Sequence, residues 1–310
     1  MLTLNVIRRE LQGDVVLLTL AHAEGIELPP FSAGAHIDLH LTEELVRPYS
    51  LCGDPQDKHH YQLGILKDSK SQGGSLAAHT LREGDVIDVS EPRNLFTLDE
   101  QANHSLLIGG GIGITPMLAM AAELHAAGRS FTLHYCARSR SQAAFIPQLE
   151  NALFAEQVRL HFSDEQRLNL DAVLSDVPPN THVYVCGPTR LMDAVNERAT
   201  HHGYLPEQCH QECFSAEVQT GGAAFEVFAA TSGITVQVLE DQTIVEALAQ
   251  AGLKVTVSCK QGICGSCLTD VLEGEPDHRD SYLTDEEKAD GDQMLLCCSR
   301  AKCGRLVIDL

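Results

Sequence analysis

Residues 259–267 read CKQGICGSC, so three cysteines stand in the spacing C-x4-C-x2-C, and Cys297 supplies a further thiol downstream. This is the ligand spacing of plant-type 2Fe-2S clusters, which are held by four thiolates. Gly262 and Gly265 let the loop backbone approach an inorganic core and adopt positive φ, and the loop amides can donate to the sulfurs. The segment therefore predicts a 2Fe-2S electron-transfer domain over residues 225–310. The predicted cluster ligands are Cys259, Cys264, Cys267 and Cys297.

Two other interpretations of these cysteines are a structural zinc site and free thiols of the core. Zinc sites usually pair their ligands as C-x2-C twice, whereas this loop offers one close triplet and a distant fourth thiol. Cys297 and Cys298 are adjacent, and in an extended MLLCCSR run their side chains point to opposite faces. Only one of the two is then expected to ligate, and Cys303 is expected to be a plain thiol.

Composition narrows the class of protein. A chain of 310 residues is long enough for two or three domains. Its net charge of -21, from 22 basic and 43 acidic side chains, disfavours nucleic acid and anionic membranes as partners. The first residues contain no apolar run long enough for a signal peptide or a membrane span, and we expect a cytoplasmic protein. Because the cytoplasm keeps thiols reduced, metal ligation or catalysis explains the 11 cysteines better than disulfides do.

The pattern of apolar residues changes twice along the chain. Short alternating runs over residues 1–100 predict an antiparallel β-barrel. Strand-like runs alternate with helical stretches over residues 101–214, which indicates an α/β domain with a parallel sheet. Residues 215–224, SAEVQTGGAA, have the composition of a linker. Residues 225–310 are expected to form an α+β, β-grasp-like domain.

Helices are expected in the second and third domains. In the α/β domain they lie near residues 117–127, 145–153 and 191–201. In the third domain, residues 243–253 are expected to form a helix in which Thr243 and Glu246 make a capping box.

Residues 105–124, SLLIGGGIGITPMLAMAAEL, predict a strand, a glycine-rich turn and a helix. Such a turn aims backbone N–H groups and the positive end of the helix at a phosphate. Thr115 is expected to cap this helix, with Pro116 in its first turn. A tight turn that merely needs glycine is the structural alternative. The predicted nucleotide-binding residues of this segment are Gly110, Gly111, Gly113, Thr115 and Pro116.

A second turn, in HVYVCGPTRLMDAV, places Cys186, Gly187 and Pro188 at the carboxyl end of a predicted parallel strand, where ligands of open α/β sheets bind. Together, GGIGITP and the later CGP resemble the NAD domain of the ferredoxin reductase superfamily. The resemblance implies that Cys186 and Gly187 lie beside the nicotinamide. It also implies that the loop after the second strand of the NAD domain, residues 136–141 with Arg138, lies at the adenosine ribose.

The barrel carries a motif of the same superfamily. Arg47-Pro-Tyr49-Ser50 resembles its R-x-Y-S flavin motif, which implies that Tyr49 and Ser50 lie against the flavin ring and Arg47 binds the phosphate. A later segment with Lys67, Gly74 and Ser75 resembles the second flavin segment, in which a short helix beginning near Ser75 presents N–H groups to the phosphate. Flavin is also the chemical link required between a two-electron donor and a one-electron cluster.

The order of the modules resembles the phthalate dioxygenase reductase family, which includes vanillate demethylase reductases. That order, flavin barrel, NAD domain and C-terminal ferredoxin, implies FMN rather than FAD. In HQECF the resemblance implies that Phe214 covers the flavin ring. By the same match Cys297 ligates and Cys298 takes a valine-like position. The residues expected at the reacting rings are Ser50, Cys186 and Phe214.

These observations predict an NADH-dependent oxidoreductase that passes electrons through FMN and a 2Fe-2S cluster to a separate Rieske-type oxygenase. The alternative is a redox sensor or interaction protein that binds a cluster and a nucleotide without turnover. A self-contained oxygenase is disfavoured, because the sequence lacks the C-x-H pairing of a Rieske centre. The loop with Arg138 has no Asp or Glu nearby in sequence, so residue chemistry leaves NADH or NADPH open there, and the family resemblance favours NADH.

Overall fold

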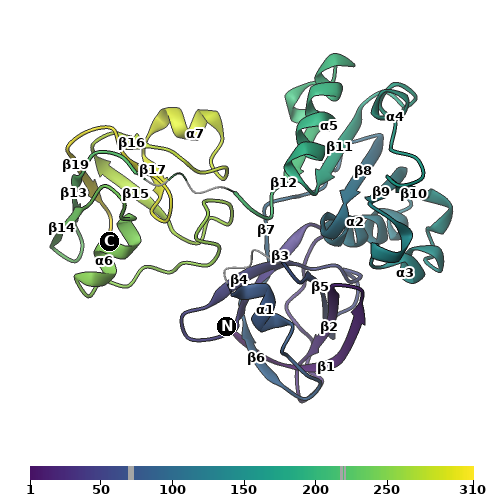
Figure 1. Ribbon diagram of the computed structural model, residues 1–310, viewed down its shortest axis with the longest axis horizontal. Coiled ribbons are helices and arrows are strands. Elements are labelled where there is room, and N and C mark those ends of the chain that lie inside the picture. Colours follow the sequence, from purple (N-terminus) through teal and green to yellow (C-terminus); the bar gives the residue numbers. More distant parts are fainter. Residues whose placement is uncertain (69–72, 217–218, 220) are drawn as a thin grey trace. The chain divides into compact units, whose positions relative to one another are not determined.

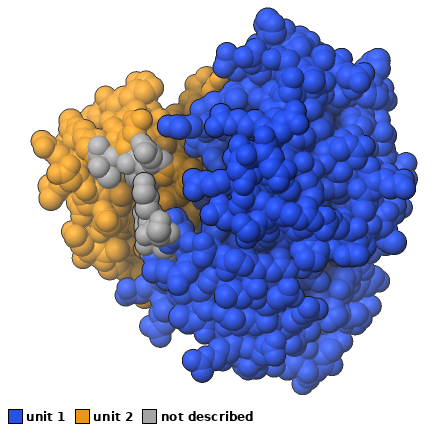
Figure 2. All heavy atoms as spheres, turned by 45° about the vertical axis from the view of Figure 1, so that its right-hand side comes forward, with its two compact units in different colours: residues 1–214 blue, residues 215–310 orange. Residues whose placement is uncertain are grey.

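The computed structural model describes every residue except 69–72, 217, 218 and 220. The described chain forms two compact units, residues 1–214 and residues 215–310, which are coloured separately in Figure 2. No helix among the described residues combines the length and apolar character needed to cross a bilayer.

An antiparallel barrel forms the first part of the N-terminal unit, as the alternating apolar runs predict (Figure 1). Its strand order is β4-β3-β6-β1-β2-β5, and a bridge between Leu51 and Leu63 joins the two ends. Inward-facing side chains such as Leu18 and Leu20 are almost fully buried. The elements are β1 (Leu2–Gln12), β2 (Val15–Ala21), β3 (Ala35–His40), β4 (Val46–Ser50), β5 (His60–Leu66), α1 (Gly74–Ala78), β6 (Val86–Val89) and β7 (Arg93–Asn94), which pairs with β3.

A five-stranded parallel sheet forms the second part of this unit, in the order β10-β9-β8-β11-β12. The order reverses between β8 and β11, and such a switch point opens a crevice at the carboxyl ends of the strands. The strands are β8 (His104–Gly110), β9 (Phe131–Ala137), β10 (Val158–Phe162), β11 (Thr181–Cys186) and β12 (Cys209–Glu212). The helices are α2 (Ile114–Ala126), α3 (Ile146–Glu150), α4 (Leu170–Ser175) and α5 (Thr189–His201), with 3-10 turns η1 (Gly111–Gly113), η2 (Arg140–Gln142), η3 (Ala155–Gln157) and η4 (Pro206–Gln208).

The second expected helix is shorter than predicted, because α3 ends at Glu150. It begins after Phe145, which has a left-handed φ of 64°. The ring of Phe145 packs against Gly64 of the barrel. Phe145 also donates its N–H to the side chain of Gln12. These contacts join the barrel to the parallel-sheet part.

The C-terminal unit is a mixed sheet covered by a helix, as expected for an α+β, β-grasp-like domain. Its main sheet has the order β14-β13-β19-β15-β17, with β13 and β19 parallel. Helix α6 (Ile244–Gln250) begins with the predicted capping box of Thr243 and Glu246, which is confirmed. The other elements are β13 (Phe225–Ala229), β14 (Ile234–Val238), β15 (Leu268–Glu273), β16 (Pro276–Asp277), α7 (Asp285–Asp290), β17 (Gln293–Leu295), β18 (Arg300–Ala301) and β19 (Arg305–Ile308).

Part of the predicted linker, residues 217, 218 and 220, lies outside the described residues. Three of its described carbonyls accept hydrogen bonds from arginines of the C-terminal unit. Arg279 donates to the carbonyls of Gln219 and Gly221, and Arg300 donates to that of Ala223.

Candidate functional site

The two glycine-containing turns of the parallel-sheet part meet at its switch point. Strand β8 leads into the turn that contains Gly113, and the neighbouring strand β11 ends at Cys186. A Cβ atom at Gly113 would lie 2.2 Å from the carbonyl oxygen of Cys186, and one at Gly187 would lie 2.9 Å from Cα of Gly110. The residues predicted to bind the nucleotide are thus in backbone contact, and glycine is required there by the close approach.

The start of α2 differs from the prediction. The N-cap is Gly113, which follows the 3-10 turn η1, and no side chain caps the helix. The prediction that Thr115 caps it is therefore wrong. Thr115 is buried inside the first turn and donates its hydroxyl to the carbonyl of Ile112. Pro116 is buried beside it, so both residues lie below the turn and support it.

Ser50, at the end of β4, and Cys186 are both neighbours of Glu212. The hydroxyl of Ser50 donates to Oε2 of Glu212 at 3.3 Å. Cys186 pairs directly with Glu212 in the β11–β12 ladder. Two of the residues expected at the reacting rings, from the barrel and the parallel sheet, are therefore brought together at this carboxylate.

Glu212 was not among the residues predicted from the sequence. Burial raises the pKa of its carboxyl to about 8, so the group is largely protonated at neutral pH. Burial, with Glu212 nearby, raises the pKa of the Cys186 thiol well above its usual value. Glu212 and Cys186 therefore present a neutral carboxyl and a neutral thiol at the carboxyl ends of β12 and β11.

The residues predicted to bind the flavin phosphate lie close together. A Cβ at Gly74 would be 2.5 Å from Cγ of Arg47, so the arginine stem packs on the first residue of α1. Ser75, the second residue of α1, accepts the N–H of Asp68 on its hydroxyl. The helix begins where the resemblance implied. Lys67 is exposed and is joined to Asp14 through its backbone.

The remaining predicted flavin residues differ in burial. Burial raises the pKa of the Tyr49 hydroxyl to about 12, so it stays protonated. Phe214 ends the N-terminal unit with 39% of its surface exposed. An aromatic side chain this exposed has surface available for a planar ring.

The predicted ribose-binding loop has acidic neighbours that the sequence did not reveal. Arg140 pairs with Glu150 and lies over the ring of Phe162. Arg138 is exposed, and its carbonyl accepts the N–H of Asp164, which brings that residue to the same edge of the sheet. Because the side chain of Arg140 is engaged in this way, Arg138 is the better placed of the two arginines to contact a bound ribose or phosphate.

The four predicted ligands form two pairs of buried thiols. A hydrogen bond with Cys259, together with burial, raises the pKa of the Cys264 thiol. A hydrogen bond with Cys297, together with burial, raises the pKa of the Cys267 thiol. Gln261 donates its N–H to the sulfur of Cys259 at 3.3 Å, as expected of loop amides around a cluster.

This arrangement fits a binuclear cluster. Each iron of a plant-type 2Fe-2S cluster takes two thiolates. The pairs Cys259–Cys264 and Cys267–Cys297 match that requirement.

The segment around the fourth thiol is not extended. Strand β17 ends at Leu295, and Cys297 and Cys298 lie in a turn with both side chains buried. The expectation that they point to opposite faces of a strand is wrong. Cys298 packs instead on the loop of residues 259–267, the cluster loop, since a Cβ at Gly262 would lie 2.5 Å from its sulfur. Gly262 and Gly265 have the predicted positive φ, 72° and 71°.

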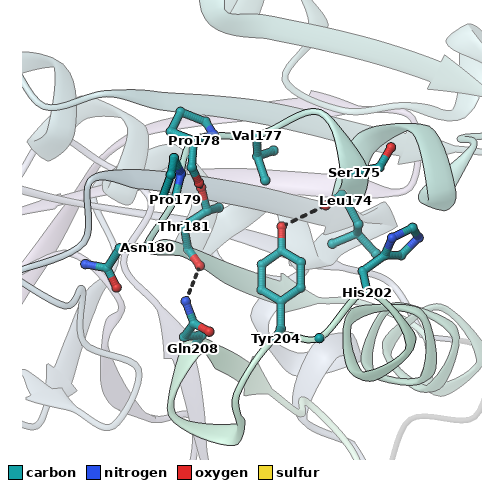
Figure 3. A pocket seen from close by; sticks show the side chains of 11 residues that line it. Leu174, Ser175, Val177, Pro178, Pro179, Asn180, Thr181, His202, Tyr204 and Gln208 are labelled. Carbon is teal, nitrogen blue, oxygen red and sulfur yellow. Dashed lines mark hydrogen bonds between the residues drawn. The ribbon is translucent and has the colours of Figure 1, made fainter.

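A cavity of about 350 Å³ lies at the amino-terminal ends of the parallel strands, beside Thr181 at the start of β11. Figure 3 shows two of its polar side chains, those of Tyr204 and Gln208, hydrogen-bonded to its own walls. Tyr204 donates to the carbonyl of Leu174, and Gln208 donates to that of Thr181. It is therefore separate from the glycine turns, which lie at the carboxyl ends of the strands.

Two protein-family descriptions match parts of the chain. Residues 227–302 match the 2Fe-2S iron-sulfur cluster binding domain. Residues 88–209 match the N-terminal domain of dimethylamine monooxygenase subunit DmmA-like proteins. The first match contains all four buried thiols described above.

Nearly the whole chain is similar to known reductases. The vanillate O-demethylase oxidoreductase of Pseudomonas sp. (strain HR199) is 49% identical over 303 residues, 96% of each chain. The structure of phthalate dioxygenase reductase, described as modular for electron transfer from pyridine nucleotides to [2Fe-2S], matches with a TM-score of 0.77 at 38% identity, covering 100% of this chain and 98% of that one. An intact type IV self-sufficient cytochrome P450 monooxygenase matches with a TM-score of 0.87 at 42% identity over 99% of this chain, which spans only 41% of that protein.

Proposed function

Since the chain belongs to the phthalate dioxygenase reductase and vanillate O-demethylase oxidoreductase family, the reductase subunits of two-component Rieske oxygenases, we propose that it carries electrons from NADH through FMN and a 2Fe-2S cluster to a separate oxygenase. The observation that carries this proposal is the hydrogen bond from Ser50 to Glu212, beside Cys186. It joins the predicted flavin site of the barrel to the predicted nicotinamide site of the parallel sheet.

The residues present suit both ligands. Arg47 and the first N–H groups of α1 would bind the phosphate of FMN, since guanidinium forks and helix N-termini both favour phosphate. The turns at Gly113 and Gly187, which pack closely on one another, would form the floor of the nucleotide site. FMN held there would supply the chemistry that splits the electron pair of NADH into single electrons for the cluster.

The chain's own residues contribute positioning. Cys186 is fully buried and would form an apolar wall beside the nicotinamide. Ser50 and the protonated Glu212 hold a proton beside Cys186, which pairs with Glu212 in the β11–β12 ladder. Transfer between two stacked rings depends mainly on their distance and orientation, so no further acid or nucleophile is required.

Flavin identity and turnover test the proposal together. Flavin released from purified protein by acid should be FMN by chromatography, and steady NADH oxidation should occur with ferricyanide as acceptor. FAD in the extract would refute the FMN assignment. A protein that binds flavin and cluster but does not oxidise NADH would refute the reductase function in favour of a binding or sensing role.

A further inference from the structure

The side chain of His278 is almost fully covered, and it forms no hydrogen bond with any residue that the structure describes. Its side chain is 8% exposed, and neither Nδ1 nor Nε2 has a partner among the described residues. Nδ1 lies 3.7 Å from Oδ1 of Asp280, whose side chain is completely buried. This distance is too long for a hydrogen bond but short for two opposite charges. Burial of an unpaired polar ring costs free energy, so this arrangement calls for a functional explanation.

Asp280 connects this imidazole to the cluster loop. Its Oδ2 accepts the N–H groups of Tyr282 and Leu283, at 3.2 and 2.8 Å, and its Oδ1 accepts the hydroxyl of Ser299 at 3.4 Å. A Cβ at Gly262 would lie 3.0 Å from Cα of Asp280. The carboxylate is therefore fixed directly behind the loop that holds the predicted ligands.

The other charged groups around the pair have partners of their own. Asp277 pairs with Arg279 at 2.8 Å and lies opposite Arg300 in the β16–β18 ladder. Lys288 donates to the carbonyl of Asp280 at 3.0 Å. Two further titratable groups among the described residues interact with Asp280: Glu287, in the capping box of α7, and the thiol of Cys298.

His278 is the single histidine of residues 215–310. Histidine is the side chain whose charge ordinarily changes between about pH 5 and 8. His278 is therefore the imidazole of this unit whose neighbouring carboxylate, that of Asp280, belongs to a residue that packs against Gly262 of the loop.

We propose that His278 takes up a proton when the cluster gains an electron, and so makes the reduction potential of the cluster depend on pH. The inference rests on the proposed function, in which the flavin supplies that electron. One electron and one proton enter together, the proton coming from solvent, and no covalent bond is broken. The added negative charge favours the imidazolium, and its Nδ1–H can then move to the charge-assisted hydrogen-bond distance of about 2.7–2.9 Å from Asp280.

The test is a redox titration of the full-length protein at several values between about pH 5 and 8, followed by the low-temperature EPR signal of the reduced cluster. In the wild type the midpoint potential should fall as pH rises. The limit is about 59 mV for each tenfold change in proton concentration when one proton accompanies one electron. His278→Gln should keep the EPR signal and remove this dependence. The control His59→Gln, at an exposed position of the barrel, should keep the wild-type slope.

Two results would overturn the proposal: a wild-type potential that does not change with pH, or a His278→Gln potential that changes as steeply as the wild type. Asp280→Asn is a second variant, and it should reduce the slope because it removes the charge that attracts the imidazolium. If neither variant assembles a cluster, the wild-type curve decides alone, and a flat curve refutes the proposal. A wild-type protein with no reducible cluster would refute the proposed function instead.

Discussion

Gly113→Ala tests the contact between the two turns of the nucleotide site. Gly113 has φ of -64°, which any residue can adopt, so the penalty for a side chain here is steric. The new Cβ would lie 2.2 Å from the carbonyl oxygen of Cys186, whereas ordinary contacts begin at 3.4 Å. The turns must therefore separate by about 1.2 Å, the difference between these distances, or the backbone must deform.

Overpacking of this kind costs about 1–3 kcal/mol. That cost falls on the stability of the fold. The effect on the reaction comes from the displaced turn, and since a misplacement of about 1 Å can cost about 100-fold in rate, we expect kcat/KM for NADH to fall by up to about 100-fold with ferricyanide as acceptor.

The matched control is Gly304→Ala in the C-terminal unit, where a Cβ meets nothing within 4 Å. It should leave kcat/KM unchanged. Flavin content and the melting temperature of each variant separate a local effect from loss of the fold. A folded, flavin-loaded Gly113→Ala protein with wild-type kcat/KM would show that the turns do not form the NADH site.

Four further predictions concern the cluster, the partner and the donor. Cys264→Ser should lose iron and sulfide and stop cytochrome c reduction, while NADH oxidation with ferricyanide persists; full iron content in this variant would contradict the ligand assignment. Cys297→Ser should lose the cluster and Cys298→Val should keep it, as iron analysis of the pair will show, and the opposite result would exchange their roles. Rising salt should slow electron delivery to a basic oxygenase surface, since residues 215–310 carry 16 acidic and 7 basic side chains and the screening length at 0.15 M is about 8 Å; a rate independent of salt would indicate an apolar interface. NADH should be modestly preferred over NADPH in side-by-side kinetics, and Ser139→Asp should increase the preference because a carboxylate there repels a 2′-phosphate; a preference for NADPH would make Arg138 a phosphate ligand.

Features that depend on short stretches of chain could be predicted from the sequence. The positive φ of Gly262 and Gly265 follows from a loop that must wrap a compact core. The capping box at Thr243 depends on residues three positions apart, and it forms as predicted.

Features that depend on contacts between distant segments could not be predicted. Glu212 acquires its environment because β12 lies beside β11 and because Ser50, from the barrel, reaches its carboxyl. The N-cap of α2 is Gly113 and not the predicted Thr115, because the glycine turn forms a 3-10 segment continuous with the helix. Cys298 faces the cluster loop because its segment turns there, where the sequence suggested a strand.

The visible spectrum of the purified protein, recorded without oxygen before and after addition of NADH, tests the central claim most directly. The account predicts flavin and 2Fe-2S absorption before addition, and loss of both when NADH is added, because both centres lie on one route from the same donor. Bleaching of the flavin with an unchanged iron–sulfur band would contradict transfer between the two centres. A spectrum without flavin, or one that NADH does not change, would contradict the account as a whole.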